Sequence, residues 1–504
     1  MRRRCRHAAR AIVAIGMVAI LPVALATAPV GVPVLGVCEA CAQGFRGEYQ
    51  VSASAIEYRA VVRDSFPESE VPGDGLTRTL PDGSVVVCVP GGYCYRYRAG
   101  EIRTASPITE DLAVTAWPGW RGVQARARVR GRFGSNDLWP RSSEKLALLE
   151  ATVELDRTAW RLRAGRQEHL GGLGAMHFDG GSVLWKGLPP VRVTAFAGRS
   201  LGRGLFAPYT GSLLAESDAL PPLEEAIVLG LEGRYRPNGA LAAVVLYQRE
   251  VRTDGASLYS ERLALDASWQ ARATRLALSG DLDVASLDVN DLRLTGCRAI
   301  GPRLSMTLEG RHSDPFFELW TIWGAFTPVA FNEARLGADY RLDAALSFEA
   351  SLAWRDYEET HTGTDLAPIE GDGWRGRAGA RWQRPGWSAS AAAGLDRGFG
   401  AYRGQLDAAV TRDFGPRTSL GLAALGTQQF AEFRFGEGTT HGLGATARQG
   451  VGAVDISARV GYERHTFTNR PGYDDYGQWR GTVAIAGRFG RDPAAPRTEG
   501  GWRP

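Results

Sequence analysis

Four closely spaced arginines form the chemically most distinctive group in the sequence. Between residues 123 and 133 polar and apolar residues alternate, so that Arg126, Arg128, Arg130 and Arg132 share one face. A β-strand aligns residues two apart, whereas a helix would scatter these arginines around its axis. Rows of guanidinium groups favour anions. The pattern therefore predicts a strand with a basic face, open either to an anionic solute or to pairing with internal carboxylates.

The same type of face recurs at two other places. One group comprises Arg161, Arg163 and Arg166, and the other comprises Arg375, Arg377 and Arg381. Each group alternates, wholly or in part, with apolar or small residues. We expect all of these arginines to line the interior of one structure. Glu154 and Asp156 lie between the first two groups and are candidate ion-pair partners.

Other residues that could perform catalysis do not form a recognisable site. His169 and His177 lie near Glu168 and Asp179, but we expect them to be turn or interior residues rather than metal ligands or acid–base groups. The sequence has no HExxH or Walker motif. No enzyme activity, cofactor or metal is expected. The formal net charge of +4, from 59 basic and 55 acidic residues, does not indicate a nucleic-acid partner.

The cysteines indicate an oxidising compartment. Cys88 and Cys94 bracket a turn-rich Val-Pro-Gly-Gly-Tyr segment, which favours a disulfide over two free thiols. Cys38 and Cys41 have CxxC spacing, but Ala42 follows them, so haem attachment is excluded there.

The N-terminus has the order of a secretory signal. Arginines at positions 2–4 precede an apolar run, and small residues follow it. We predict that residues 1–42 are a signal peptide cut after Ala42, with a cut after Ala26 as the alternative. Prolines 22, 29 and 33 would interrupt an uncleaved anchor helix.

The rest of the chain repeats the period of two many times. Short segments rich in Gly, Pro and Asn alternate with longer connections, as in transmembrane barrels with tight turns at one end. We predict an all-β protein, a single antiparallel transmembrane β-barrel over residues 43–489 with about 18 strands (16–20). Residues 64–108 are expected to form a long loop or small hairpin, and residues 490–504 a polar tail. Residues 316–326 are apolar on both strand faces and are left unassigned between strand, infolded loop and short helix.

Aromatic residues mark the ends of the predicted strands. Trp374 and Trp382 share a face eight residues apart, about 26 Å along a strand, as aromatic girdles at two membrane interfaces require. The last alternating row runs from Trp479 to Phe489, although 15 residues follow it. A closing strand of this kind resembles the assembly signal that barrel-assembly machinery reads.

One segment resembles a known family. Residues 160–185 read WRLRAGRQEHLGGLGAMHFDGGSVLW, and this stretch resembles a motif of alginate-export-like and related porin-type barrels. The resemblance implies an 18-stranded outer-membrane barrel that passes a solute, with Arg161, Arg163 and Arg166 in a basic conduit beside Arg126, Arg128 and Arg130. It does not identify the solute.

These observations together predict a porin-like channel in the outer membrane of a Gram-negative bacterium. It would contact outer-membrane lipid and pass small or anionic solutes through a partly arginine-lined lumen. A non-transporting barrel, serving as adhesin, receptor or structural protein, is the alternative. An outer-membrane enzyme is the third and least favoured hypothesis.

Overall fold

The computed structural model describes residues 44–81, 83–89, 91–135, 145–201, 226–253, 258–314, 330–358, 371–398, 401–432, 437–468 and 474–491. The predicted signal peptide, residues 316–326 and all but the first two residues of the predicted tail lie outside these segments. The only helix in them is the short η1 (Glu68–Glu70). None of the described helical residues forms a helix long and apolar enough to cross a membrane.

Strands make up nearly all of the described chain. Those of the first half are β1 (Gly44–Pro67), β2 (Thr77–Thr79), β3 (Val85–Cys88), β4 (Tyr93–Ala105), β5 (Pro107–Trp117), β6 (Val123–Gly134), β7 (Leu146–Asp156), β8 (Trp160–Gly171), β9 (Gly174–Leu188), β10 (Val191–Ser200), β11 (Ala226–Tyr235) and β12 (Leu241–Arg252). Those of the second half are β13 (Leu258–Ala271), β14 (Thr274–Asp283), β15 (Asp288–Ala299), β16 (Leu304–Ser313), β17 (Phe331–Arg341), β18 (Leu346–Tyr357), β19 (Asp372–Arg384), β20 (Trp387–Gly398), β21 (Ala401–Asp413), β22 (Thr418–Glu432), β23 (Glu437–Val451), β24 (Val454–Thr468) and β25 (Tyr476–Arg491).

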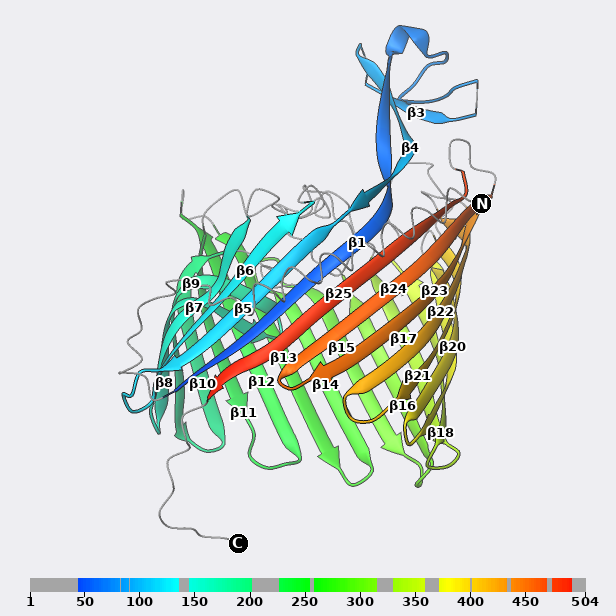
Figure 1. The fold of residues 1–504 in the computed structure, drawn as a ribbon. Helices are drawn as coiled ribbons and strands as arrows, with labels where there is room; N and C mark the ends of the chain where they lie inside the picture. The colour runs from blue at the N-terminus through cyan, green and yellow to red at the C-terminus, as the bar shows by residue number, and fades with distance from the viewer. Residues whose placement is uncertain are drawn as a thin grey trace.

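The strands close into one antiparallel barrel (Figure 1). Consecutive strands from β5 to β25 pair with one another, and β1 pairs with both β5 and β25. The ring therefore holds β1 and the 21 strands β5–β25, which makes 22. The prediction of about 18 strands was wrong. Several neighbouring strands are joined by only two residues, such as Arg272–Ala273. The alternation in the sequence does not show where one such strand ends and the next begins.

The two ends of the barrel differ in their connections. At the lower end in Figure 1, ten links of two to five residues join the strands. The opposite end carries the longer links, which include residues 201–225 and 314–330. In transmembrane barrels the short-turn end is periplasmic. We refer to the two ends as the short-turn rim and the long-connection rim.

Local turn chemistry explains the short-turn rim. The Asn238 carboxamide oxygen accepts the backbone N–H groups of Ala240 and Leu241 at 2.9 and 3.0 Å, which closes the β11–β12 turn. Asp343 caps the β17–β18 turn in the same way. Gly386, with φ +73°, occupies the left-handed position of the two-residue β19–β20 turn, where a side chain would be strained.

The barrel closes where its first and last strands meet. Phe489 of β25 lies over Gly47 of β1, where any side chain would overlap the ring. The Phe489 ring also lies 6.2 Å from the Phe45 ring and 6.4 Å from the Tyr49 ring. The aromatic end of the last strand is therefore packed on the seam, on the exposed side of the wall.

One hairpin projects far beyond the long-connection rim (Figure 1). From Glu57 onward β1 leaves β25 and pairs only with β4, up to Pro67 opposite Tyr93. The far end, which we call the projecting domain (residues 64–96), contains η1, β2 and β3 and the disulfide between Cys88 and Cys94.

The projecting domain has its own small core. Val71, Val86 and the disulfide are buried, and Phe66 and Leu80 pack against them. A core this small needs a covalent staple. The disulfide supplies one, and the Glu68–Arg78 ion pair, at 2.5 Å, adds a second link within the domain.

Candidate functional site

The two faces of the barrel wall differ in polarity and exposure. Large apolar side chains such as Leu352, Leu406 and Leu443 are 58–70% exposed on one face. Charged and amide side chains such as Glu232 and Gln248 are at most 3% exposed on the other. Side chains spread apart on the convex side of a barrel and converge on the concave side. The polar face is therefore the inner wall, and the candidate functional site is the lumen that it surrounds.

The arginine row of β6 lies on this inner wall and is paired with carboxylates. Arg130 forms two hydrogen bonds to Asp111 of β5, at 2.8 and 3.0 Å. Arg126 lies 3.2 Å from Glu150 of β7, and Arg128 lies 4.0 Å from Asp111. Arg132, near the long-connection rim, is also on this face and half-buried.

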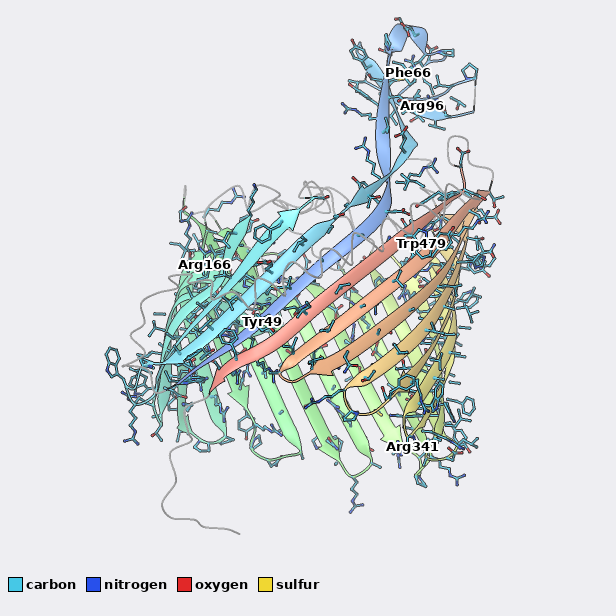
Figure 2. All side chains as sticks on the ribbon, in the orientation of Figure 1. Tyr49, Phe66, Arg96, Arg166, Arg341 and Trp479 are labelled. Carbon is cyan, nitrogen blue, oxygen red and sulfur yellow. A yellow bond between two sulfur atoms is a disulfide. The ribbon has the colours of Figure 1, made fainter. Side chains whose placement is uncertain are left out.

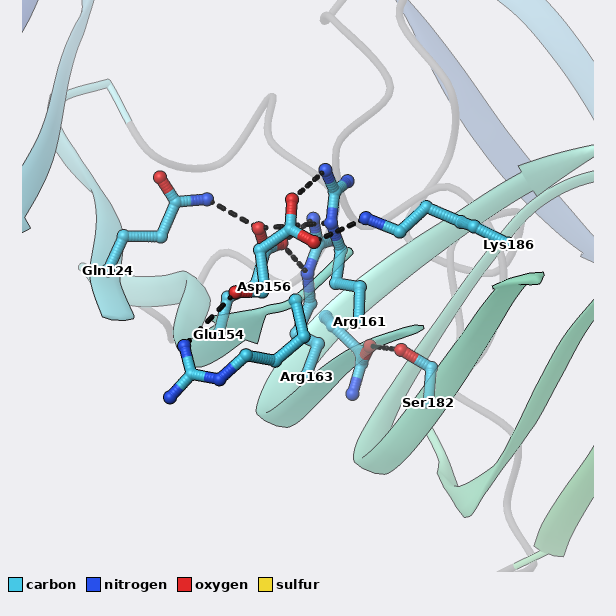
Figure 3. Close-up of polar contacts among 9 residues, drawn as sticks. Gln124, Glu154, Asp156, Arg161, Arg163, Ser182 and Lys186 are labelled. Atoms are coloured by element: carbon cyan, nitrogen blue, oxygen red, sulfur yellow. Dashed lines mark hydrogen bonds and ion pairs between the residues drawn. The ribbon is translucent and has the colours of Figure 1, made fainter. Parts of the chain in front are cut away.

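A second cluster lies where β7, β8 and β9 meet (Figure 3). Cross-strand register places Arg163 opposite Glu154 and Arg161 opposite Asp156. Arg163 donates to Glu154 at 2.9 Å, and Arg161 donates to Asp156 at 2.7 Å. Lys186 adds a third cation, 2.5 Å from Asp156. Directly opposed charges of unlike sign stabilise a sheet, so this cluster fixes the local register as well as the charge.

The arginines cover their carboxylates. The Arg126 side chain is 49% exposed and that of its partner Glu150 is 11% exposed. For Arg161 and Arg163 the fractions are 38% and 31%, whereas their shared partner Glu154 is 5% exposed. A solute in the lumen would therefore meet guanidinium groups first, with the carboxylates beneath them.

The third predicted group lies on a different part of the wall. Arg375 bonds Asp396 at 3.0 Å, Arg377 lies 3.6 Å from Glu349, and Arg381 lies 4.0 Å from the same carboxylate. Their strand, β19, is 12 strands along the ring from β7, slightly more than half of the 22-strand circuit. The structure therefore places the β19 arginines on the wall opposite the arginines of β6 and β8, and does not bring the two sets together.

Arg166 departs from the predicted row. It is one position out of phase with Arg161 and Arg163, and it bonds Asp179 through both carboxylate oxygens at 2.8 Å. Its guanidinium also donates to the Leu148 carbonyl at 3.0 Å. Figure 2 shows Arg166 in the upper part of the wall. Arg166 thus bridges the point where β8 stops pairing with β7.

Beyond Arg166 the β8–β9 hairpin folds into the lumen. A side chain on Gly172 would lie 2.8 Å from the Ala264 side chain and 2.7 Å from that of Asp266, both on the inner face of β13. Along the wall, β13 is four strand spacings from β9, about 19 Å. Contact is possible only if the hairpin end, residues 167–178, bends inward over β10–β13. We call this segment the inner tip.

A row of glycines allows this bend. Gly165, Gly180 and Gly198 lie side by side on β8, β9 and β10. A side chain at any of them would come within 2.0–2.4 Å of a backbone oxygen of the adjoining strand. Gly165 also has φ +116°, a conformation that other residues rarely adopt. The backbones are therefore packed more closely than a flat sheet with side chains permits.

The inner tip is held by an apolar cluster and by polar contacts, among them one between His169 and Glu232. Leu173, Met176 and Phe178 of the tip pack with Phe196, Val228, Leu246 and Ala264 of the wall. Phe178 is fully buried, and its ring centroid lies 5.3 Å from that of Phe196. His169 stacks on Phe196 at 4.3 Å, and its Nε2 lies 3.3 Å from the buried Glu232 carboxylate.

The histidines are thus placed in the packed base of the tip. His177 is 1% exposed and lies 3.9 Å from Glu168. In the described part of the chain, no group of three or more His, Cys, Asp or Glu side chains is arranged to hold a metal. Sequence reasoning missed the inner tip itself. The signal was present, because Gly165, Gly171, Gly172 and Gly180 all fall within the segment that carried the family resemblance.

Comparison with known proteins gives only distant likenesses. No family model matches the chain, and no curated protein matches it. Among solved structures, OccAB1 of Acinetobacter baumannii aligns with 88% of this chain and 96% of its own at 11% identity and a TM-score of 0.37. The outer-membrane protein OpdK of Pseudomonas aeruginosa aligns with 88% and 99% at 9% identity and 0.38. The translocation pore of the P pilus usher PapC aligns with 88% and 99% at 10% identity and 0.41. These TM-scores do not establish a common family.

Proposed function

We propose that this protein is an outer-membrane channel that passes small polar solutes, with a preference for anions along the wall formed by β6–β8. The observation that carries the proposal is the closed 22-strand ring with apolar residues outside and charged residues inside. A soluble protein would bury the apolar face and expose the charged one. A closed barrel satisfies every backbone group of its wall internally, as a lipid environment requires.

Aromatic residues on the outer face support membrane placement. One set lies near the short-turn rim: Trp185, Trp269, Tyr340, Trp382 and Trp387. Another lies near the long-connection rim: Trp354, Trp374, Tyr402, Tyr462 and Trp479. Leucines and valines lie between the two sets. This arrangement matches the apolar band, about 25 Å tall, and the aromatic girdles of outer-membrane barrels.

The projecting domain supports an oxidising location at the cell surface. It contains a disulfide and extends from the long-connection rim, the outer end in the usual orientation of such barrels. The predicted signal peptide leads to the same compartment. Insertion would depend on barrel-assembly machinery, which we propose reads the closing strand β25.

The anion preference rests on the exposed arginines above buried carboxylates. Guanidinium donors at Arg126, Arg161 and Arg163 face the lumen, and a carboxylate or phosphate group is their best-matched ligand. The resemblance to alginate-export-like barrels remains a prediction, and alginate is one anionic candidate among many.

Planar-bilayer recording tests both parts of the proposal. We expect the purified protein to give stepwise currents and a reversal potential that favours chloride in a KCl gradient. Replacing Arg126, Arg161 and Arg163 by Gln should shift that potential towards potassium, because Glu150 and Glu154 would lose their partners. The matching Lys variant should keep the sign of the selectivity. Absence of current at all voltages would overturn the channel, and an unchanged reversal potential would overturn the basic wall.

A second role is favoured by the surface of the projecting domain. Val85 and Val87 are 55–56% exposed on one face of β3, Val89 just after the strand is 53% exposed, and Leu76 is 60% exposed. An exposed apolar row of this kind marks an interaction surface. The alternative of a non-transporting adhesin or receptor therefore keeps a structural basis, and the conductance experiment separates it from the channel. The absence of enzyme activity remains a prediction.

A further inference from the structure

Two arginines point away from the lumen at the short-turn rim. Register places Arg384 of β19, Trp387 of β20 and Arg412 of β21 directly side by side. Arg384 is in phase with Trp382 on the outer face, and Arg412 is in phase with the exposed Leu406. Both guanidinium groups therefore lie on the lipid side of the wall, within two residues of the strand ends.

Neither arginine forms an ion pair in the described part of the protein, although the charge of Asp343 in the β17–β18 turn acts on Arg384 from beyond ion-pair distance. The Arg412 guanidinium lies over the rings of Trp387 and Phe414, at 4.6 and 5.6 Å from their centroids. That of Arg384 lies 5.9 Å from the Trp382 ring. No carboxylate of the described segments comes within 4.0 Å of either group. Each cation is thus held in place by aromatic faces and keeps its hydrogen-bond donors available.

An apolar hollow begins at Arg412, and Arg384 lies on the other side of Trp387 in the strand register. The hollow has a volume of about 880 Å³, and Trp387, Arg412 and Phe414 form one end of its lining. The small side chains of Ala445, Ala447 and Ala458 form its floor, and larger ones flank it: Leu420, Leu422, Val460 and Val483. The volume is within the range of about 300–1,000 Å³ that is typical of small-molecule sites.

We propose that this hollow binds one phospholipid with an anionic headgroup, with the lipid phosphate between Arg384 and Arg412 and an acyl chain along the alanine floor. The charges lie at the rim, and the apolar lining extends from it towards the middle of the wall. That is the order of phosphate and acyl chain in the adjoining leaflet, and arginines near a membrane surface attract anionic lipid.

The proposal depends on the membrane placement proposed above, but not on conduction. A second copy of the chain would fit less well, because a copy presenting its own outer wall would bring apolar side chains against two guanidinium groups that have no ion-pair partner. Burying an unpaired charge in that way is costly.

Native mass spectrometry of the detergent-solubilised full chain tests the site, with phosphatidylglycerol and phosphatidylcholine as probes. We expect one phosphatidylglycerol to be retained per chain, in preference to phosphatidylcholine. Replacing both Arg384 and Arg412 by Gln should weaken its retention roughly thirtyfold. The matched control is Arg298→Gln, because Arg298 is also an exposed outward arginine at the short-turn rim, but it lies on β15, and neither β15 nor the strands paired with it line the hollow.

A second variant keeps the test decisive if the double variant does not fold. Ala447→Phe fills the hollow and leaves both arginines, and we expect it to reduce phosphatidylglycerol retention while bilayer currents persist. Equal retention in the double variant and in Arg298→Gln would overturn the site. The site would also be overturned if the wild type formed a dimer or trimer that bound no lipid and that dissociated when Ala447 was replaced by Phe. Loss of current with lipid retention intact would contradict the channel and leave the lipid site standing.

Discussion

Replacing Phe178 by Ala should release the inner tip from the barrel wall. Phe178 is fully buried between the tip and β10, with its ring stacked on Phe196. An aromatic side chain buries about 150–250 Å², which at about 25 cal/mol per Å² corresponds to roughly 4–6 kcal/mol. Measured Phe→Ala substitutions in cores cost about 3–5 kcal/mol. The equilibrium between docked and released tip should therefore shift by about two to three and a half orders of magnitude.

Thiol labelling reports on that equilibrium. A cysteine at Leu173, which is 8% exposed in the docked tip, would react with a soluble thiol reagent only when the tip is released. Cys297 is the one free thiol in the described part of the chain, and Cys297→Ser is therefore made first in every variant of this experiment. We expect Phe178→Ala to raise the labelling rate at least about a hundredfold. Phe348→Ala is the matched control, because Phe348 is 40% exposed on the outer face. Equal labelling rates in the two variants would refute the infolded tip.

Three other predictions concern the tip and the projecting domain. Gly172→Val should expel the tip, because its side chain would overlap the inner face of β13, and single-channel conductance should rise in the bilayer. It would count against the infolded tip if conductance did not change. Replacing Cys88 and Cys94 by Ala should remove about 2–4 kcal/mol from the projecting domain, seen as protease cleavage there while the barrel stays intact; cleavage of the barrel as well would contradict separate folding. The backbone N–H of Gly91 holds the pKa of Glu68 below its ordinary value. The stabilisation is therefore present above the ordinary pKa and is lost as pH falls through the folded value. Amide protection in β2 and β3 should fall on acidification in the wild type, whereas Glu68→Gln should show no such step.

The alternation of residues allowed the wall to be predicted from the sequence. The Arg126–Arg132 row and the final row ending at Phe489 lie on the faces that the period of two assigned to them, because each side-chain direction in a strand is fixed by its neighbours. The strand number could not be obtained in this way. It depends on recognising every two-residue connection, and Gly172–Leu173 and Arg272–Ala273 do not interrupt the local pattern.

The charge network and the inner tip depend on contacts between distant residues. Arg126 pairs with Glu150 and does not face an empty lumen. This pairing follows from the β6–β7 register, which includes a bulge after Arg128. The contact of Gly172 with Ala264 joins segments that are far apart in the sequence. Glycine marks where backbones come close, but the sequence does not say which partner approaches.

The most direct test of the channel is thiol modification during single-channel recording. In the Cys297→Ser background, Arg126→Cys puts a thiol on the inner wall and Ala127→Cys puts one on the outer wall. We predict that a charged, bulky thiol reagent reduces the current through Arg126→Cys and does not change the current through Ala127→Cys. Equal responses of the two variants, or folded protein that never conducts, would contradict the proposal that this barrel is a channel lined by the β6 arginines.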